Sequence, residues 1–197
     1  MLTFKKIVHP TVAVYLMEMD FAESVAIGVM VNAGARDEMW PKEAGLAHAL
    51  EHLNLRGTVK FPDGDVLNSH IEDVGGNKRA NTNKERTFYL GKIPHEHKER
   101  LIEVLSEVVQ NPILSEDRVL TEKGSILREM EIRDDTMVRS LYNMTSEFVF
   151  KNHPLSHDTL GTIDSVSSFT RNDFVKFREK FYTPANYTLI FAGRINE

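Results

Sequence analysis

Hydrophobic residues recur along the chain with two different periods, which predict a mixture of strands and helices. Runs rich in β-branched and aromatic residues indicate strands at residues 11–17, 24–33, 87–92 and 187–192. Apolar residues at helical spacing indicate helices at residues 65–74, 95–110, 115–135 and 172–181. Because the two kinds of element do not alternate strictly, we expect an α+β fold with a largely antiparallel sheet covered by helices.

Polar and glycine residues at the ends of these runs support the predicted helices. Ser115 can cap the helix over residues 115–135, and Thr170 and Asp173 are three apart, as in a capping box. The pair Gly75 and Gly76 ends the helix over residues 65–74. The 197 residues fit a single domain over residues 1–197 that is long enough to bury its own core.

One further amphipathic helix carries a candidate metal site at residues 48–52, His-Ala-Leu-Glu-His. Residues three and four apart are neighbours on a helix, so His48, Glu51 and His52 share one face while Ala49 and Leu50 turn toward the core. Two histidines one turn apart can bind the same metal ion. The order H-x-x-E-H is the signature of inverzincins, although three fixed positions alone are only moderately specific.

A catalytic zinc ion typically has three protein ligands, so a third His, Asp or Glu is expected. Glu129 is the best candidate, and Glu122, seven residues earlier on the same helix face, could orient a ligand through a hydrogen bond. By composition alone, Glu122, Glu129 and Glu131 could equally form the solvated side of a surface helix. Glu51 is the candidate general base. The alternative is that Glu51 is an exposed helix residue paired to a lysine.

Composition limits which residues could bind a metal and which classes of protein the chain could belong to. The chain has no cysteine, so a tightly held metal must use histidine and carboxylate. The formal net charge of −5 argues against nonspecific nucleic-acid binding, and no apolar run approaches the roughly 20 residues that span a membrane. The first residues lack the apolar core of a signal peptide, so we expect a cytoplasmic protein.

Several segments on either side of the two histidines form a recognisable pattern. They are Asn32-Ala33-Gly34-Ala35-Arg36-Asp37-Glu38, Gly45-Leu46-Ala47, Arg56-Gly57-Thr58, Gly75-Gly76, Ala80, Thr82, Glu85, Thr87, His153-Pro154-Leu155, Leu160-Gly161-Thr162 and Tyr182-Thr183-Pro184-Ala185-Asn186. In this order they resemble the pitrilysin-like zinc peptidases, which include the mitochondrial processing peptidases. The resemblance covers nearly the whole chain.

The resemblance implies a role for each acidic residue of the candidate site. In that family the third zinc ligand is a glutamate separated from the second histidine by about 76 residues, and 76 residues lie between His52 and Glu129. The resemblance thus implies one zinc ion held by His48, His52 and Glu129, with Glu122 in support. It also implies a fold that forms one half of a pitrilysin-like enzyme.

The family also binds extended peptides as an added strand beside the segment after the double glycine. Here that segment contains Arg79, Ala80, Asn81 and Thr82. The family usually has asparagine where this chain has Arg79, and the added positive charge leads to the hypothesis of a preference for acidic substrate residues.

The chain is shorter than the family's two-half enzymes. The second half supplies groups thought to stabilise the tetrahedral intermediate, so we expect full activity to need a homologous half, a partner subunit or self-association. Three functions stay open: a zinc-dependent endopeptidase domain, a noncatalytic zinc- and peptide-binding subunit, and a protein with a purely structural zinc. The sequence does not decide between zinc, manganese and cobalt.

Overall fold

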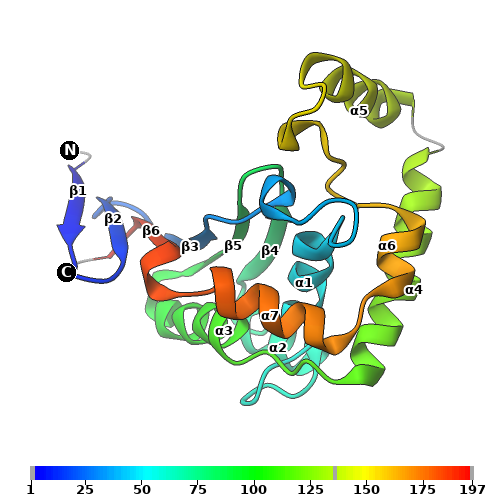
Figure 1. Ribbon diagram of the computed structural model, residues 1–197. Helices are drawn as coiled ribbons and strands as arrows, with labels where there is room; N and C mark the ends of the chain where they lie inside the picture. The colour runs from blue at the N-terminus through cyan, green and yellow to red at the C-terminus, as the bar shows by residue number, and fades with distance from the viewer. Residues whose placement is uncertain (1–2, 135–136, 196–197) are drawn as a thin grey trace.

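The computed structural model describes residues 3–134 and 137–195, and it shows helices packed against one six-stranded sheet (Figure 1). The strands are β1 (Thr3–Val8), β2 (Ala13–Glu18), β3 (Ser24–Val31), β4 (Asn77–Thr82), β5 (Thr87–Pro94) and β6 (Tyr187–Gly193). Their order is β1-β2-β6-β3-β5-β4. Only the β2–β6 pair is parallel among the described strands, so the prediction of a largely antiparallel α+β sheet is confirmed.

The helices are α1 (Leu46–Leu55), α2 (Gly64–Glu72), α3 (Lys98–Gln110), α4 (Glu116–Asp134), α5 (Met137–Val149), α6 (Ile163–Ser168) and α7 (Arg171–Phe181). Short 3-10 turns lie at Ala35–Asp37, His95–His97, Pro154–Ser156 and Pro184–Asn186. The helix predicted over residues 95–110 therefore begins with such a turn. Position 135 of the predicted helix over 115–135 lies outside the described residues.

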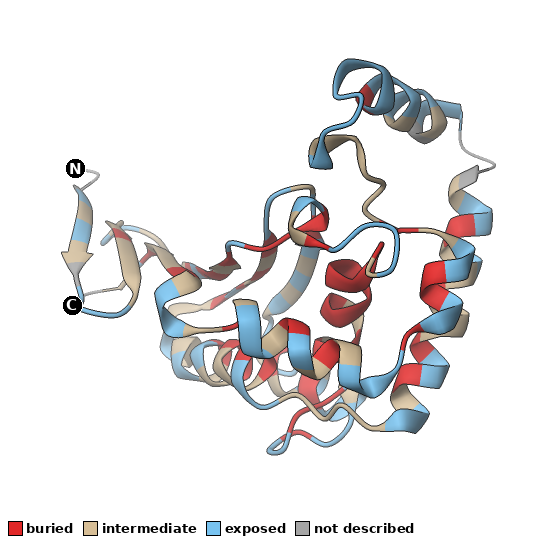
Figure 2. Cartoon of the chain, viewed as in Figure 1, coloured by how far each residue is buried: buried red, intermediate tan, exposed pale blue. Residues whose placement is uncertain are grey.

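The core forms where the central strands meet α1 and α3. Alternate residues of β3, including Val25, Ile27 and Val29, are buried, as expected for a strand that presents one face to helices. Leu46, Leu50 and Leu53 of α1 are fully buried in the same cluster. Burial of these side chains fixes α1 against the sheet, and α1 is the helix that carries the two histidines (Figure 2).

The described helices include none that is both long enough and apolar enough to cross a lipid bilayer.

Candidate metal centre

The candidate site begins with two histidines that lie one turn apart on α1. Their ring centroids are 4.6 Å apart, with the rings at 63° to each other. His48 is buried, and the side chain of His52 is about one quarter exposed. Since the leucines on the opposite side of α1 are packed in the core, both rings are held at the surface of the helix that faces α4.

Glu129 of α4 lies beside both rings, although it is far from them in the sequence. Its Oε2 atom is 3.7 Å from His48 Nε2 and 3.6 Å from His52 Nε2. Ligand atoms of the three residues all lie within 4.8 Å of one another. Zinc ligands at tetrahedral angles and bond lengths of about 2.0–2.2 Å are separated by roughly 3.3–3.6 Å, so this group fits a zinc ion.

Glu122 lies on the same side of α4 and contacts the second histidine. Its Oε2 atom is 3.1 Å from His52 Nδ1, and its Oε1 atom accepts a hydrogen bond from Arg56 Nε. The bond at Nδ1 leaves Nε2 of His52 directed toward Glu129, which is how a supporting carboxylate sets the tautomer of a metal-binding histidine. Only 2% of the Glu122 side chain is exposed, so the alternative of a solvated glutamate is wrong for this residue.

The charge states of Glu122 and His52 depend on each other. Burial raises the pKa of Glu122, but hydrogen bonds from His52 and Arg56 outweigh it, and the pKa is lowered overall. Burial lowers the pKa of His52, but its bond to Glu122 and the nearby carboxylates raise it. The acidic surroundings therefore favour a positive charge at this site, whether it is carried by a proton or by a metal ion.

Glu51 faces the same space from between the two histidines. It is buried, and its Oε2 atom accepts a hydrogen bond of 2.6 Å from the Thr82 hydroxyl. Its partner is thus a threonine of β4 rather than a lysine. Burial raises the pKa of Glu51, and the bond from Thr82 partly offsets that rise. A carboxyl group with a raised pKa can exchange a proton closer to neutral pH.

The site opens into a cavity of about 570 Å³. One wall contains Ala80, Asn81 and Thr82 of β4, which is an edge strand because its one partner among the described strands is β5. Arg79 is exposed on the same strand but does not line the cavity. Of the four predicted substrate-contacting residues, three therefore line the same cavity as the candidate metal ligands.

The opposite wall of this cavity was not predicted from the sequence. It contains Val138, Tyr142 and Asn143 of α5, together with Arg133 of α4 and Asp158. Arg133 forms an ion pair with Asp158, whose Oδ2 atom also accepts a hydrogen bond of 2.9 Å from Asn143 Nδ2. Arg133 follows Glu129 by one helical turn, and this spacing was the available signal that it would face the site.

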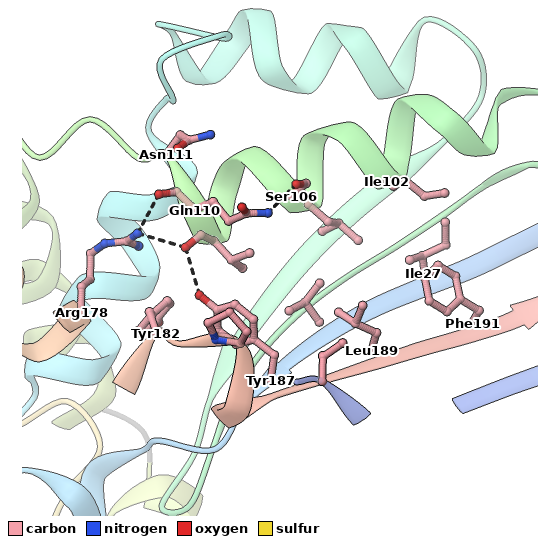
Figure 3. A pocket seen from close by; sticks show the side chains of 15 residues that line it. Ile27, Ile102, Ser106, Gln110, Asn111, Arg178, Tyr182, Tyr187, Leu189 and Phe191 are labelled. Atoms are coloured by element: carbon pink, nitrogen blue, oxygen red, sulfur yellow. Dashed lines mark hydrogen bonds between the residues drawn. The ribbon is translucent and has the colours of Figure 1, made fainter. Parts of the chain in front are cut away.

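A second cavity, of about 510 Å³, lies between α3, α7 and β6 (Figure 3). Its lining is mostly apolar and includes Ile27, Ile102, Leu189 and Phe191. Its polar edge is occupied by hydrogen bonds within the protein, because Arg178 donates to the carbonyl oxygens of residues 109 and 110. It contains none of the candidate metal ligands, so it is separate from the site described above.

Comparison with known proteins identifies the family of the chain. Residues 14–163 match the family model described as Insulinase (Peptidase family M16). The chain belongs to the M16 insulinase family. This membership confirms the resemblance to pitrilysin-like zinc peptidases on which the third ligand was assigned.

Relatives and solved structures agree with this membership. The chain is 32% identical over 178 residues to a protein of Rickettsia bellii named "Uncharacterized zinc protease", covering 90% of the chain and 43% of that relative. It is 31% identical over 170 residues to the human mitochondrial-processing peptidase subunit beta, covering 86% of the chain and 34% of that relative. The chain thus spans less than half the length of these relatives.

Two solved structures share its fold. A protease from Helicobacter pylori superposes with a TM-score of 0.92 at 24% identity, over 100% of this chain and 48% of that one. Pitrilysin superposes with a TM-score of 0.86 at 20% identity, over 99% of this chain and 21% of its own length. The fold is therefore that of one part of an M16 peptidase.

Proposed function

We propose that the chain is a zinc-dependent endopeptidase domain that hydrolyses extended peptides. The observation that carries the proposal is the convergence of His48, His52 and Glu129, with Glu51 buried between them and bonded to Thr82. Two imidazoles and one carboxylate are a donor set found in catalytic zinc sites, which keep one position open. The relatives named as zinc proteases support the same chemistry.

His48, His52 and Glu129 would hold the zinc ion, which when bound would supply a water molecule of lowered pKa and polarise the substrate carbonyl. Glu51 takes a proton from the attacking water and later delivers it to the leaving amine. Thr82 orients the Glu51 carboxylate for that transfer. Glu122 holds His52 in the tautomer that leaves Nε2 available as a ligand.

The proposed substrate is a peptide bound as an additional strand along the open edge of β4. An edge strand offers unpaired backbone N–H and C=O groups, which can bind peptides of many sequences. Ala80 and Asn81 lie on this strand beside the cavity. The preference for acidic residues attributed to Arg79 stays a prediction, and equal cleavage of matched acidic and neutral peptides would contradict it.

Full activity is proposed to need a second homologous half, whether on the same polypeptide, on a partner subunit or on a second copy. The relatives include proteins named as subunits of mitochondrial-processing peptidase. These subunits are more than twice as long as the region that matches this chain. Absence of the groups from such a half would lower the rate by about 100- to 1000-fold. A single zinc-peptidase domain over residues 1–197 and a cytoplasmic location both stay predictions.

The alternative function is a noncatalytic subunit that binds zinc and peptide without turnover. Hydrolysis of an unstructured peptide library should be measured with zinc, with chelator, and with the Glu51→Gln variant. Zinc content and native mass should be measured in parallel, with manganese and cobalt tested in place of zinc. Glu131→Gln, which alters an exposed glutamate of α4, is the matched control.

The outcomes separate the hypotheses. We expect Glu51→Gln to retain zinc while losing about 100- to 10,000-fold in rate. Zinc binding without turnover in the parent would favour the noncatalytic subunit. Activity that survives both chelation and Glu51→Gln would refute the metallopeptidase. A closed four-ligand site and a fold lost on chelation would indicate structural zinc.

A further inference from the structure

The metal-binding helix α1 begins without a side-chain cap of its own. Its N-cap residue is Gly45, whose φ angle of 86° lies in the left-handed region. A Cβ atom at this position would come within 2.3 Å of the Leu160 carbonyl oxygen. The close contact with Leu160 therefore requires glycine, and glycine cannot supply the oxygen that normally accepts hydrogen bonds at a helix start.

A carboxylate from outside the helix accepts these bonds instead. Glu38 Oε2 accepts from the Gly45 amide and Glu38 Oε1 from the Ala47 amide, each at 2.9 Å. The Leu46 amide between them donates to the Glu43 carbonyl oxygen at 2.9 Å. Two of the three amides at the start of α1 thus depend on one side chain that lies seven residues before the helix cap.

Glu38 is well placed to fix the direction of the turn that holds the first metal ligand. Ala47 directly precedes His48, so the bond at Ala47 holds the backbone next to that histidine. Leu46 in the first turn and Leu50 and Leu53 in the following turns are all fully buried in the core, so packing holds the whole helix, whereas the Glu38 bonds act on its first turn alone. Loss of the Glu38 contact should therefore displace His48 more than His52.

The two acceptor oxygens of Glu38 and its burial favour a carboxyl group in this contact. Glu38 is only 6% exposed, and burial raises the pKa of its carboxyl group well above the ordinary value, although the two N–H donors oppose that rise. Its two oxygens accept from two separate amides. A glutamine would keep one acceptor oxygen and point an NH2 group at the other N–H donor, so it could satisfy only one of them.

We propose that Glu38 is a positioning residue for the metal centre, which sets the orientation of His48 by capping α1 from outside the helix. This inference rests on the proposed function, because it needs His48 to be a metal ligand. It assigns a role in the site to a residue that is neither a candidate metal ligand nor one of the residues that line the cavity.

The test compares Glu38→Gln and Glu38→Asp with the parent protein and with Asp173→Asn. Asp173 also caps a helix start, since it accepts from the Thr170 amide and hydroxyl at α7, but it lies outside the metal site. Zinc affinity is measured by competition with a chelator. The visible absorption of the Co²⁺-substituted protein reports ligand geometry, and circular dichroism with thermal unfolding reports the fold.

We expect Glu38→Gln to keep the secondary structure, to bind zinc about 10- to 100-fold more weakly and to shift the Co²⁺ absorption bands. Glu38→Asp, which keeps two acceptor oxygens on a shorter chain, should recover part of the affinity. Asp173→Asn should lower the unfolding temperature without changing affinity or spectrum.

Parental zinc affinity and an unchanged Co²⁺ spectrum in Glu38→Gln would overturn the inference, even if the unfolding temperature falls. If Glu38→Gln does not fold, Glu38→Asp decides by the same two measurements. Failure of both variants to fold would also overturn it, since Glu38 would then be needed for folding rather than for positioning. A parent that binds no zinc would instead refute the proposed function itself.

Discussion

Two of the helices that border the candidate metal site, α1 and α5, are built in opposite ways. In α1 the apolar residues face inward, and Leu46, Leu50 and Leu53 are fully buried. In α5 most apolar residues are exposed, with Met137 85% exposed and Phe148 84% exposed. Figure 1 shows α5 set apart from the helices that cover the sheet, and Figure 2 shows it mostly exposed.

This contrast separates the rigid and the adjustable parts of the site. The histidines stand on a helix whose position is fixed by core packing, which keeps ligand geometry constant. The opposite wall is held by polar contacts, because the side of α5 nearest the protein carries Asn143 and the buried Ser146. Segments with few buried apolar contacts open at lower free energy, so α5 can adjust while α1 stays in place.

The largest expected effect is on stability and compares one leucine from each helix. Leu50→Ala removes a fully buried side chain and should lower the free energy of unfolding by about 2–5 kcal/mol. Leu141→Ala removes a side chain that is 63% exposed and should change it by less than about 0.5 kcal/mol. Urea unfolding measures both values, and equal losses would remove the contrast between the helices.

A second prediction concerns the link between α1 and α4. Glu122→Gln replaces a buried carboxylate that contacts His52 and Arg56, and should lower the free energy of unfolding by about 1–3 kcal/mol. It should also weaken zinc binding by about 10- to 100-fold. The exposed Glu131→Gln serves as the control, and matching values in the two variants would show that the buried contact does not support the ligand.

The same residue predicts a pH dependence. The pKa of Glu122 is lower in the folded protein than its ordinary value, since the bonds from His52 and Arg56 outweigh the effect of burial. Its contribution to stability is thus complete above the unfolded pKa of about 4.3 and is lost as pH falls through the folded value. In metal-free protein the stability gap between parent and Glu122→Gln should narrow below about pH 4.3; a gap that widens there would contradict the sign.

The smallest expected effect is confined to α5. Asn143→Ala removes the hydrogen bond to Asp158 and should lower the free energy of local opening of α5 by about 1 kcal/mol. Amide hydrogen exchange should then be roughly five-fold faster in α5 and unchanged in α1. The exposed Glu147→Gln on the same helix is the control, and equal acceleration in α1 would indicate that the two helices open together.

Much of the fold could be predicted from local patterns. The predicted strand over residues 24–33 corresponds to β3, and the capping box of Thr170 and Asp173 is present at the start of α7. Helix α5 was not predicted, although its apolar residues recur at helical spacing. Such spacing indicates a helix but does not say which side of it will be covered, because that depends on what packs nearby.

The candidate site likewise has a part that the sequence could predict and a part that it could not. The pairing of His48, Glu51 and His52 follows from helical geometry within five residues, so the sequence determined it. Glu129 required the family resemblance, because no local rule relates two helices that far apart. Glu38 lay within a segment of the family pattern, but its role as the cap of α1 depends on a loop whose path the sequence does not specify.

By itself, the sequence determined the local chemistry: which residues share a helix face, where most helices and strands begin and end, and that a metal must bind through histidine and carboxylate. The tertiary structure decided which distant groups meet these residues, namely Glu129 and Glu122 at the histidines, Thr82 at Glu51 and Glu38 at the helix start. The physical reason is the distance along the chain over which each effect acts. Backbone periodicity acts over a few residues, whereas the packing of α1, α4 and the sheet depends on side chains contributed from the whole chain.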